Sequence, residues 1–315
     1  MPMSDEPCDL SPVANHPGMP PDAEHGAPER LPDGLVLVST PIGNLGDMSL
    51  RAISALKAAD LVLCEDTRTT ARLLREYGIT TRTAPLHEHN EDRSIPAVLD
   101  MLRAGRRVAL VSDAGTPLVS DPGYRLVRAA LAEGLAVGGV PGANAAVLAL
   151  TLSGLPPQPF LFMGFPPPRG AARRAAFASL RAAERAGLAA TLLFYEAPHR
   201  LAETLADMAQ VLGDRPAAVA RELTKRFEEV RRDRLAALAE YYDTTKPRGE
   251  ITIVVAPMPP ETPENDDLDA ILRTALAAHR LKEAVAMVTA ATGLPRKLVY
   301  ARALALAGGG DGDAT

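Results

Sequence analysis

The chain has 315 residues, of which 47% are apolar, 4% are aromatic and none is Trp. This length suits about two domains, and their cores must be built from Ala, Leu and Val, as in helix-covered parallel sheets. A net charge of −5 and two cysteines, Cys8 and Cys64, exclude a strongly basic protein and a disulfide framework.

Two further classes of protein are disfavoured by the pattern of apolar residues. No apolar run approaches the ~20 residues of a membrane span. The N-terminus is acidic and Pro-rich and has no apolar core of a secretory signal. We therefore expect a cytoplasmic protein with two reduced thiols.

The acidic residues are concentrated in two segments. Residues 1–34 hold seven acidic residues and one Arg, and residues 256–270 hold five acidic residues and no basic one. Residues 271–310 hold six basic residues and one acidic residue. The segments that we expect to fold are thus mildly basic, which permits RNA binding without arguing strongly for it.

The first part of the chain alternates short apolar runs with helical patterns. Residues 1–33 have no periodicity and are expected to form a disordered tail. Strands are predicted at 35–38, 61–64, 108–111 and 136–140, with helices beginning after Ser49, passing through Leu73 and Leu74, and covering 124–133. This alternation predicts an α/β domain with a parallel sheet over 34–154.

A second α/β domain is predicted over 155–257. Its strand candidates are 160–162, 191–195, 217–220 and 251–255, and its helices lie near 171–186, 199–211 and 234–241. The Pro-rich acidic stretch 258–267 is predicted to be a linker. Residues 268–307 resemble three helices, the last two forming a helix-turn-helix-like pair.

Gly and Pro gather in four loops that follow strands of the first domain. The loops cover 41–47, 112–117, 119–123 and 141–144. Ligands of α/β domains bind beyond the carboxyl ends of the strands, and Gly lets a backbone approach them closely. Each loop alone would be a plain turn, but four together predict a ligand cleft. None matches a dinucleotide or Walker A motif, which disfavours a phosphate site of those kinds.

Two polar motifs offer candidate catalytic groups. Glu65, Asp66 and Arg68 follow a strand and supply two carboxylates and an anion contact, although Asp66 or Thr67 is equally suited to cap a helix. The segment 87–91, His-Glu-His-Asn-Glu, has no third ligand at a recognisable spacing, so no metal site is predicted.

Other motifs have both a functional and a structural interpretation. Tyr195 and Glu196 would line the cleft, or the segment simply begins a helix at Pro198. Basic residues cluster around Arg169–Arg185 and Arg221–Arg234, as on an RNA-binding surface or a solvated helix face.

Eight ordered motifs carry a resemblance to a known family. They are STPIGNLGD (39–47), CEDTR (64–68), HEHNE (87–91), VSDAGTPLVSDPG (111–123), VPGANA (140–145), FYEAPHR (194–200), RELTKRFEE (221–229) and RGE (248–250). They resemble the ribosomal RNA small-subunit methyltransferase I family, which belongs to the class III, tetrapyrrole-methylase-like methyltransferases. The match covers about 35–255, and residues 281–306 look like that family's C-terminal module. The chain departs from the pattern at Cys64, where Ala is usual, and at Ala197, where Ser is usual.

The resemblance implies two tandem α/β domains of the tetrapyrrole methylase type, a cleft between them that holds S-adenosylmethionine, a small C-terminal helical module, and a homodimer. It also implies 2′-O-methylation of a cytidine, cytidine-1402 of 16S rRNA, in the decoding centre of the small ribosomal subunit. Contacts with the cofactor carried over by motif fall at Leu45, Thr116, Val119, Asn144, Ala145, Tyr195 and near Gly249-Glu250.

Further site residues follow from the loops and the chemistry. The remaining cofactor candidates are Pro41, Gly43, Asn44, Asp113, Gly115, Pro141, Gly142 and Glu196. For the proton acceptor, Glu65 and Asp66 come first, with Arg68 ordering them, and Glu88 or His89 second. The candidates for RNA contact are Arg169, Arg173, Arg174, Arg226, Arg296 and Lys297.

Two alternatives stay open at this point. One is a class III enzyme acting on a small molecule such as a tetrapyrrole. The other is a non-catalytic ribosome-assembly factor that retains a cofactor pocket. The 64–68 and 87–91 motifs and the helical tail favour the RNA methyltransferase over the first, and the intact cleft loops favour it over the second.

Overall fold

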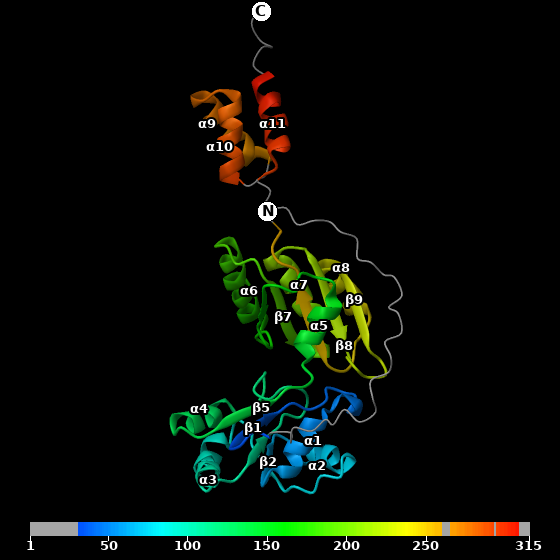
Figure 1. Ribbon diagram of the computed structural model, residues 1–315. Helices are drawn as coiled ribbons and strands as arrows, with labels where there is room; N and C mark the ends of the chain where they lie inside the picture. Colours follow the sequence, from blue (N-terminus) through cyan, green and yellow to red (C-terminus); the bar gives the residue numbers. More distant parts are fainter. Residues whose placement is uncertain (1–30, 260–264, 293, 309–315) are drawn as a thin grey trace, which may run out of the picture. The chain divides into compact units, whose positions relative to one another are not determined.

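The computed structural model describes residues 31–259, 265–292 and 294–308. They form two compact units that divide between Asn144 and Ala145 (Figure 1). We expected this division after Gly154. It falls earlier because helix α5, Ala145–Ser153, packs against the strands of the second sheet.

The first unit contains a five-stranded parallel sheet with the strand order β3-β2-β4-β1-β5. The strands are β1 Leu35–Val38, β2 Leu61–Cys64, β3 Thr83–Pro85, β4 Val108–Leu110 and β5 Val137–Val140. All four strand pairs in this sheet are parallel, which confirms the predicted sheet type. The short strand β3 was not predicted.

Helices cover both faces of this sheet (Figure 1). They are α1 Leu50–Ala58, α2 Thr67–Glu76, α3 Glu91–Arg103 and α4 Tyr124–Ala132. Alternate strand residues face opposite ways, so Val36 and Val62 pack with α1 and α2, whereas Leu35 and Leu63 pack with α3 and α4. Helix α1 begins where predicted, because the Ser49 hydroxyl accepts a hydrogen bond from the Ala52 N–H at 3.1 Å.

The second unit contains a mixed sheet with the strand order β6-β7-β10-β8-β9. Its strands are β6 Phe160–Phe162, β7 Thr191–Glu196, β8 Pro216–Arg221, β9 Glu229–Arg234 and β10 Ile251–Val255. The β6–β7 pair is parallel and the other three pairs are antiparallel. Four strands lie where predicted, but β9 was missed because it is a largely charged edge strand.

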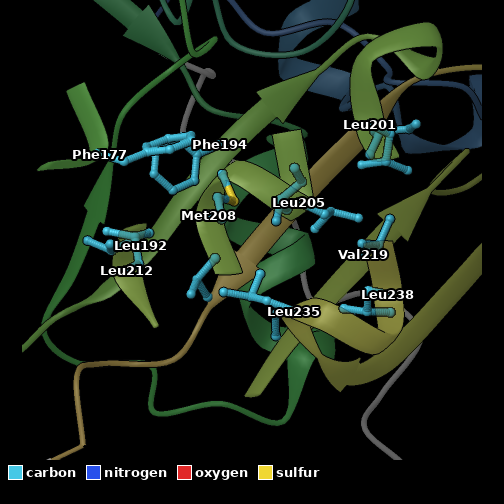
Figure 2. Close-up of a cluster of buried hydrophobic side chains, with 14 of the residues drawn as sticks. Phe177, Leu192, Phe194, Leu201, Leu205, Met208, Leu212, Val219, Leu235 and Leu238 are labelled. Carbon is cyan, nitrogen blue, oxygen red and sulfur yellow. The ribbon is translucent and has the colours of Figure 1, made fainter. Parts of the chain in front are cut away.

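One apolar cluster joins the sheet of the second unit to three of its helices. Helices α6 Gly170–Arg185, α7 Leu201–Leu212 and α8 Leu235–Thr244 pack on the sheet. Figure 2 shows Leu201, Leu205 and Met208 of α7 directed into this cluster, with Phe177 beside Phe194. The two rings meet edge to face at 5.7 Å between centroids.

Short 3-10 helices at Leu45–Asp47 in the first unit and Pro198–Arg200 in the second complete the regular structure before the C-terminal helices.

Three helices follow near the C-terminus, as predicted. They are α9 Asn265–Ala278, α10 Leu281–Thr292 and α11 Arg296–Gly308. Leu272, Val285 and Val299 are buried together, and Arg302 pairs with Asp269 at 2.6 Å. Helix α9 begins inside the stretch expected to be a linker, since residue 265 is already helical.

Parts of the predicted tail and linker lie outside the described residues, namely 1–30 and 260–264. Residues 31–33 belong to the first unit rather than to the tail, because Asp33 pairs with Arg107 at 2.7 Å and Leu31 packs on the core. Across the described segments, no helix has the length and apolar character to cross a membrane.

Candidate functional site

Three loops of the first unit meet because β4, β1 and β5 are neighbours in the sheet. The loops follow the carboxyl ends of these strands, the usual position of ligand sites in α/β domains. Thr40 and Gly115 exchange two backbone hydrogen bonds, at 2.9 and 3.2 Å. The Ser39 N–H donates to the carbonyl of Val140 at 3.1 Å. The predicted cluster of Gly- and Pro-rich loops is therefore a connected structure.

Thr116 lies at the centre of these three loops. Its hydroxyl donates to the carbonyl of Ala143 at 3.1 Å. It lies 3.4 Å from both the Ser39 hydroxyl and the Asn144 side-chain nitrogen. Thr116 and Asn144, two residues that the resemblance assigns to cofactor binding, are thus in contact. Ser39 was not predicted, and its hydroxyl beside a Gly-rich loop was the available signal.

The backbone of these loops adopts conformations that few side chains permit. Gly115 has φ +84°, and a Cβ there would lie 3.1 Å from the Ile42 side chain. A Cβ at Gly142 would lie 2.8 Å from that of Ser39. Leu118 and Ser120 have φ of 70° and 66° although neither is Gly. Such residues cost about 1–3 kcal/mol each and are common at ligand sites.

Residues of the β1 loop lie largely at the surface. Gly43, Asn44 and Leu45 are exposed, and Pro41 is buried. The Asn44 side chain caps the 3-10 helix by accepting from the Gly46 N–H at 3.0 Å. The Tyr77 hydroxyl donates to the Leu45 carbonyl, which ties this loop to the end of α2.

Carboxylates gather where β2 and β4 end. The Asp113 carboxylate accepts a hydrogen bond from the Asp66 N–H at 3.1 Å. Burial, with the nearby negative charges of Glu65 and Asp113, raises the pKa of Asp121 to about 6. Asp121 was not among the predicted site residues. The adjacency of β2 and β4, which the sequence alone does not reveal, brings it near Glu65.

Asp66 serves as a helix cap. Its carboxylate accepts from the Arg68 N–H at 2.8 Å and pairs with the Arg68 guanidinium at 3.0 Å. Hydrogen bonds from the Arg68 side chain and backbone lower the pKa of Asp66. A carboxylate held in this way is a weak proton acceptor. The capping interpretation of this motif therefore describes Asp66, and Glu65 is left exposed at the end of the strand.

The segment 87–91 forms a turn that leads into α3. Asn90 accepts from the His87 N–H at 2.8 Å, and the buried Glu91 accepts from the Leu126 N–H at 3.0 Å. Glu88 and His89 are exposed. Asn90 and Glu91 thus hold the turn, while Glu88 and His89 stay accessible.

Two predicted residues of the second unit have different environments. Tyr195 is half-buried, and its ring lies 4.9 Å from Phe162 and 5.6 Å from Phe165. Glu196 is buried, and its carboxylate accepts from Thr204 at 2.6 Å and from the Ala197 N–H at 2.7 Å while also pairing with Arg200. Contrary to our expectation, Glu196 fixes the start of the following helix, and both of its oxygens already have partners within the chain.

The predicted pair Gly249-Glu250 is tied to the loop after β8. Gly249 has φ +87°, and a Cβ there would lie 2.1 Å from the Glu222 carboxylate. Lys225 donates to both Glu222 and Glu250 at 2.9 Å. Glu222 and Lys225 were not predicted, although they stand in the 221–229 motif.

The basic residues predicted to contact RNA do not form one group. Arg173 was misassigned, since it is wholly buried and pairs with Asp207 at 2.6 Å and Glu203 at 2.8 Å. Arg174 also pairs with Asp207 but stays about half exposed. The remaining four candidates are exposed, namely Arg169, Arg226, Arg296 and Lys297.

Two family models match the chain. The model "Tetrapyrrole (Corrin/Porphyrin) Methylases" matches residues 34–239. The model "RsmI C-terminal HTH domain" matches residues 262–307, which cover the three C-terminal helices except for the last residue of α11.

Curated relatives match over nearly the whole chain. A protein of Mesorhizobium japonicum called ribosomal RNA small subunit methyltransferase I is 46% identical over 90% of this chain and 96% of its own length. A protein of the same name from Micromonospora olivasterospora is 46% identical over 89% of each chain.

Solved structures share the fold at low sequence identity. The methyltransferase CobJ has a TM-score of 0.53 and 20% identity, over 71% of this chain and 94% of its own. Uroporphyrin-III C-methyl transferase from Thermus thermophilus, solved with S-adenyl homocysteine, has a TM-score of 0.50 and 21% identity, over 70% and 96%.

Proposed function

The chain belongs to the ribosomal RNA small subunit methyltransferase I family, and from this premise we propose that it methylates a ribose 2′-hydroxyl of 16S rRNA in the small-subunit decoding centre, at cytidine-1402. It is an S-adenosylmethionine-dependent methyltransferase. The observation that carries the proposal is the 46% identity over 90% of the chain, which includes both methylase units and the helical module. We place the reaction in the cytoplasm and the active protein in a homodimer.

The loops of the first unit fit S-adenosylmethionine. Gly142 and Gly115 bring backbone close together where side chains would collide, so backbone groups are available for an adenosine and an amino acid. The cofactor carries no phosphate, and the loops have no phosphate-binding motif. The carboxylates Asp113, Asp121 and Glu65 suit a ligand with a positively charged sulfonium.

We propose that the contacts with the cofactor in the first unit centre on Thr116, Asn144, Val119 and Leu45. Thr116 and Asn144 lie together, and Val119 donates to the Thr116 carbonyl at 3.4 Å. Asp113, Gly115, Pro141 and Gly142 surround them in the same loops. In the second unit, Ala145, Tyr195, Gly249 and Glu250 remain the proposed contacts from the resemblance.

Bound S-adenosylmethionine supplies an electrophilic methyl group on its sulfonium sulfur. The ribose hydroxyl is a weak acid, so a protein group must accept its proton as the O–C bond forms. We propose Asp121 for this role, because a carboxylate with a pKa of about 6 is ionised at neutral pH yet more basic than an ordinary Asp. Glu65 stands beside it as the second candidate. Asp66 is set aside because Arg68 neutralises it.

Glu88 and His89 remain alternatives for the proton acceptor. Both are exposed in the turn before α3. Arg68 is 91% exposed at its side chain while pairing with Asp66, so it is available to an RNA phosphate.

The test is methyl transfer from labelled S-adenosylmethionine to small subunits isolated from a strain that lacks this gene. Mass spectrometry of the nucleosides should identify 2′-O-methylcytidine, with N4-methylation distinguished by its base fragment. Label on a precorrin-like substrate but not on subunits would instead support the small-molecule alternative. Cofactor binding without label on subunits, free rRNA or precorrins would support the non-catalytic assembly factor.

A further inference from the structure

The second unit contains a pocket of about 280 Å³ that has no role in the scheme above. One wall is formed by the end of β8 and the start of β9, and the other by the end of α8 with residues 245–248. The pocket also borders the loop between β8 and β9, and its lining residue Arg248 directly precedes Gly249. We call it the β8–α8 pocket.

Positive charge dominates this pocket once its ion pairs are counted. Glu222 and Glu250 share Lys225 at 2.9 Å, and Glu229 pairs with Arg221 at 3.0 Å and Arg231 at 3.4 Å, so these three acidic and three basic charges balance. Lys246 and Arg248, two other lining residues, are exposed. Within the described residues neither forms an ion pair. The pocket therefore offers two cations to an anionic ligand.

A hydrogen-bonding group in the pocket also lacks a partner. Tyr242 lines it and is only 2% exposed, and its buried hydroxyl has no hydrogen-bond partner among the described residues. A buried polar group without a partner costs about 1–3 kcal/mol. Burial raises the pKa of Tyr242 to about 12, so its hydroxyl keeps its proton and can donate. A ligand oxygen that reached this hydroxyl would satisfy it.

The outer edge of the pocket is an exposed aromatic ring. Phe227 is 65% exposed, and the Arg226 guanidinium lies 5.6 Å from its ring centroid. The loop that presents it is held in place, since Thr224 N–H donates to Glu228 at 2.6 Å. Glu222 and Thr224 adopt positive φ values of 51° and 65°. An exposed ring beside Arg side chains is a platform on which single-stranded bases stack.

We propose that the β8–α8 pocket binds one nucleotide of single-stranded RNA, with the phosphate on Lys246 and Arg248 and the base against Phe227. The choice of RNA rests on the proposed function. A phosphate and a stacked base use the cations, the unpartnered hydroxyl and the exposed ring together. An apolar ligand would leave the two cations unmatched, and a carboxylate ligand alone would leave the exposed ring unused.

The experiment measures binding of the full-length protein to a short fluorescent oligoribonucleotide by anisotropy across a salt series. Lys246→Ser/Arg248→Ser should weaken binding about tenfold and flatten the dependence of log K on log salt by about 0.7 per lost phosphate contact. Phe227→Ser should weaken binding about tenfold without changing that slope, and Phe227→Trp should restore it. The control Lys57→Ser/Arg128→Ser removes the same charge from exposed positions in the first unit.

Tyr242→Phe separates ligand binding from stability. It removes one oxygen that has no internal partner, so the unfolding temperature should not fall, whereas RNA affinity should. The proposal would be overturned by wild-type affinity in the three variants that should lose it, namely Lys246→Ser/Arg248→Ser, Phe227→Ser and Tyr242→Phe. It would also be overturned by a loss equal to that of the control, which would mean a nonspecific charge effect.

Two other outcomes would reassign the pocket. In one, cytidine monophosphate binds as tightly as the oligonucleotide and loses its binding in the same variants. That outcome would make the pocket a site for free nucleotides. A lower mass of Phe227→Ser in sedimentation, with RNA affinity unchanged, would make it a contact between copies of the chain. None of these measurements involves methyl transfer, so failure of wild type to label subunits would count against the proposed function alone.

Discussion

The backbone N–H of Asp66 donates a hydrogen bond to the carboxylate of Asp113 across 3.1 Å and thereby joins the loops after β2 and β4. The two strands are neighbours in the sheet, so this contact holds together the loops that carry the carboxylates beyond their carboxyl ends. Glu65 precedes Asp66 in the loop after β2. Its negative charge helps to raise the pKa of Asp121, which lies in the loop after β4. The candidate proton acceptor therefore depends on residues about 50 positions apart in the sequence.

Asp121→Asn should lower the rate of methyl transfer about 10²–10⁴-fold while leaving the affinity for S-adenosylmethionine nearly unchanged, since only the proton acceptor is lost. In wild type the rate should rise with pH through about 6, where the Asp121 carboxyl ionises, and then level off. Single-turnover rates from pH 5 to 8 measure both effects. Full turnover in this variant would move the role to Glu65, for which Glu65→Gln is the companion test.

The same substitution has a predicted effect on stability. A carboxyl with a raised pKa binds its proton more tightly in the folded chain, so its contribution to stability is complete below about pH 4 and is lost as pH rises through about 6. Asp121→Asn should therefore be more stable than wild type at pH 8, by on the order of 1–2 kcal/mol after solvent screening, and equal to it at pH 4. Urea unfolding at the two pH values measures the difference. The exposed Asp243→Asn is the matched control variant.

Thr116→Val should weaken S-adenosylmethionine binding about tenfold. The change keeps the volume of the side chain but removes the hydroxyl that donates to Ala143 and contacts Ser39 and Asn144. Thr116→Ser keeps that hydroxyl and should bind normally. Calorimetric titration with S-adenosylhomocysteine measures both variants, with Thr151→Val of α5 as a control whose hydroxyl bonds within its own helix. Equal affinity of Thr116→Val and wild type would remove Thr116 from the binding site.

Hydrophobic patterning predicted most of the fold because most strands here are buried on both faces. The runs at β1, β2 and β4 are continuous and apolar, which is typical of a covered parallel sheet. Strand β9, Glu-Val-Arg-Arg-Asp-Arg, shows no such run, since it lies at the edge of its sheet. Helix α5 is apolar all round, so its sequence gives no face that would assign it to the second unit.

The candidate site was only partly predictable for a related reason. The Gly- and Pro-rich loops are visible in the sequence, but the strand order decides which loops meet. The charges of Glu65 and Asp113 help to raise the pKa of Asp121. They come close to it only because β2 and β4 are neighbours in the sheet, which the sequence alone does not reveal. The burial of Arg173 did have a signal, because it shares helical spacing with the buried Phe177 and Leu180.

Arg173→Met should destabilise the protein by about 3–5 kcal/mol, because it leaves the carboxylate of Asp207 without its closest partner in the interior. The double variant Arg173→Met/Asp207→Leu should recover much of that loss. Arg174→Met, which removes a half-exposed partner of the same carboxylate, should cost no more than about 1 kcal/mol. Urea unfolding measures all three. A stable Arg173→Met protein with reduced RNA affinity would restore Arg173 as an RNA contact.

Arg296→Ser/Lys297→Ser should weaken binding to small subunits several-fold while sparing S-adenosylmethionine binding. Both side chains are exposed at the start of α11, and the buried Val299 and Ala303 that hold this helix are unchanged. Lost phosphate contacts should also reduce the salt dependence of subunit binding. The matched control is Arg280→Ser/Lys282→Ser, which removes equal charge from exposed positions at the start of α10. Equal losses in both variants would indicate a general charge effect. Unchanged affinity of Arg296→Ser/Lys297→Ser for small subunits would show that the start of α11 does not contact RNA. The helices α9–α11 would then have a packing role only.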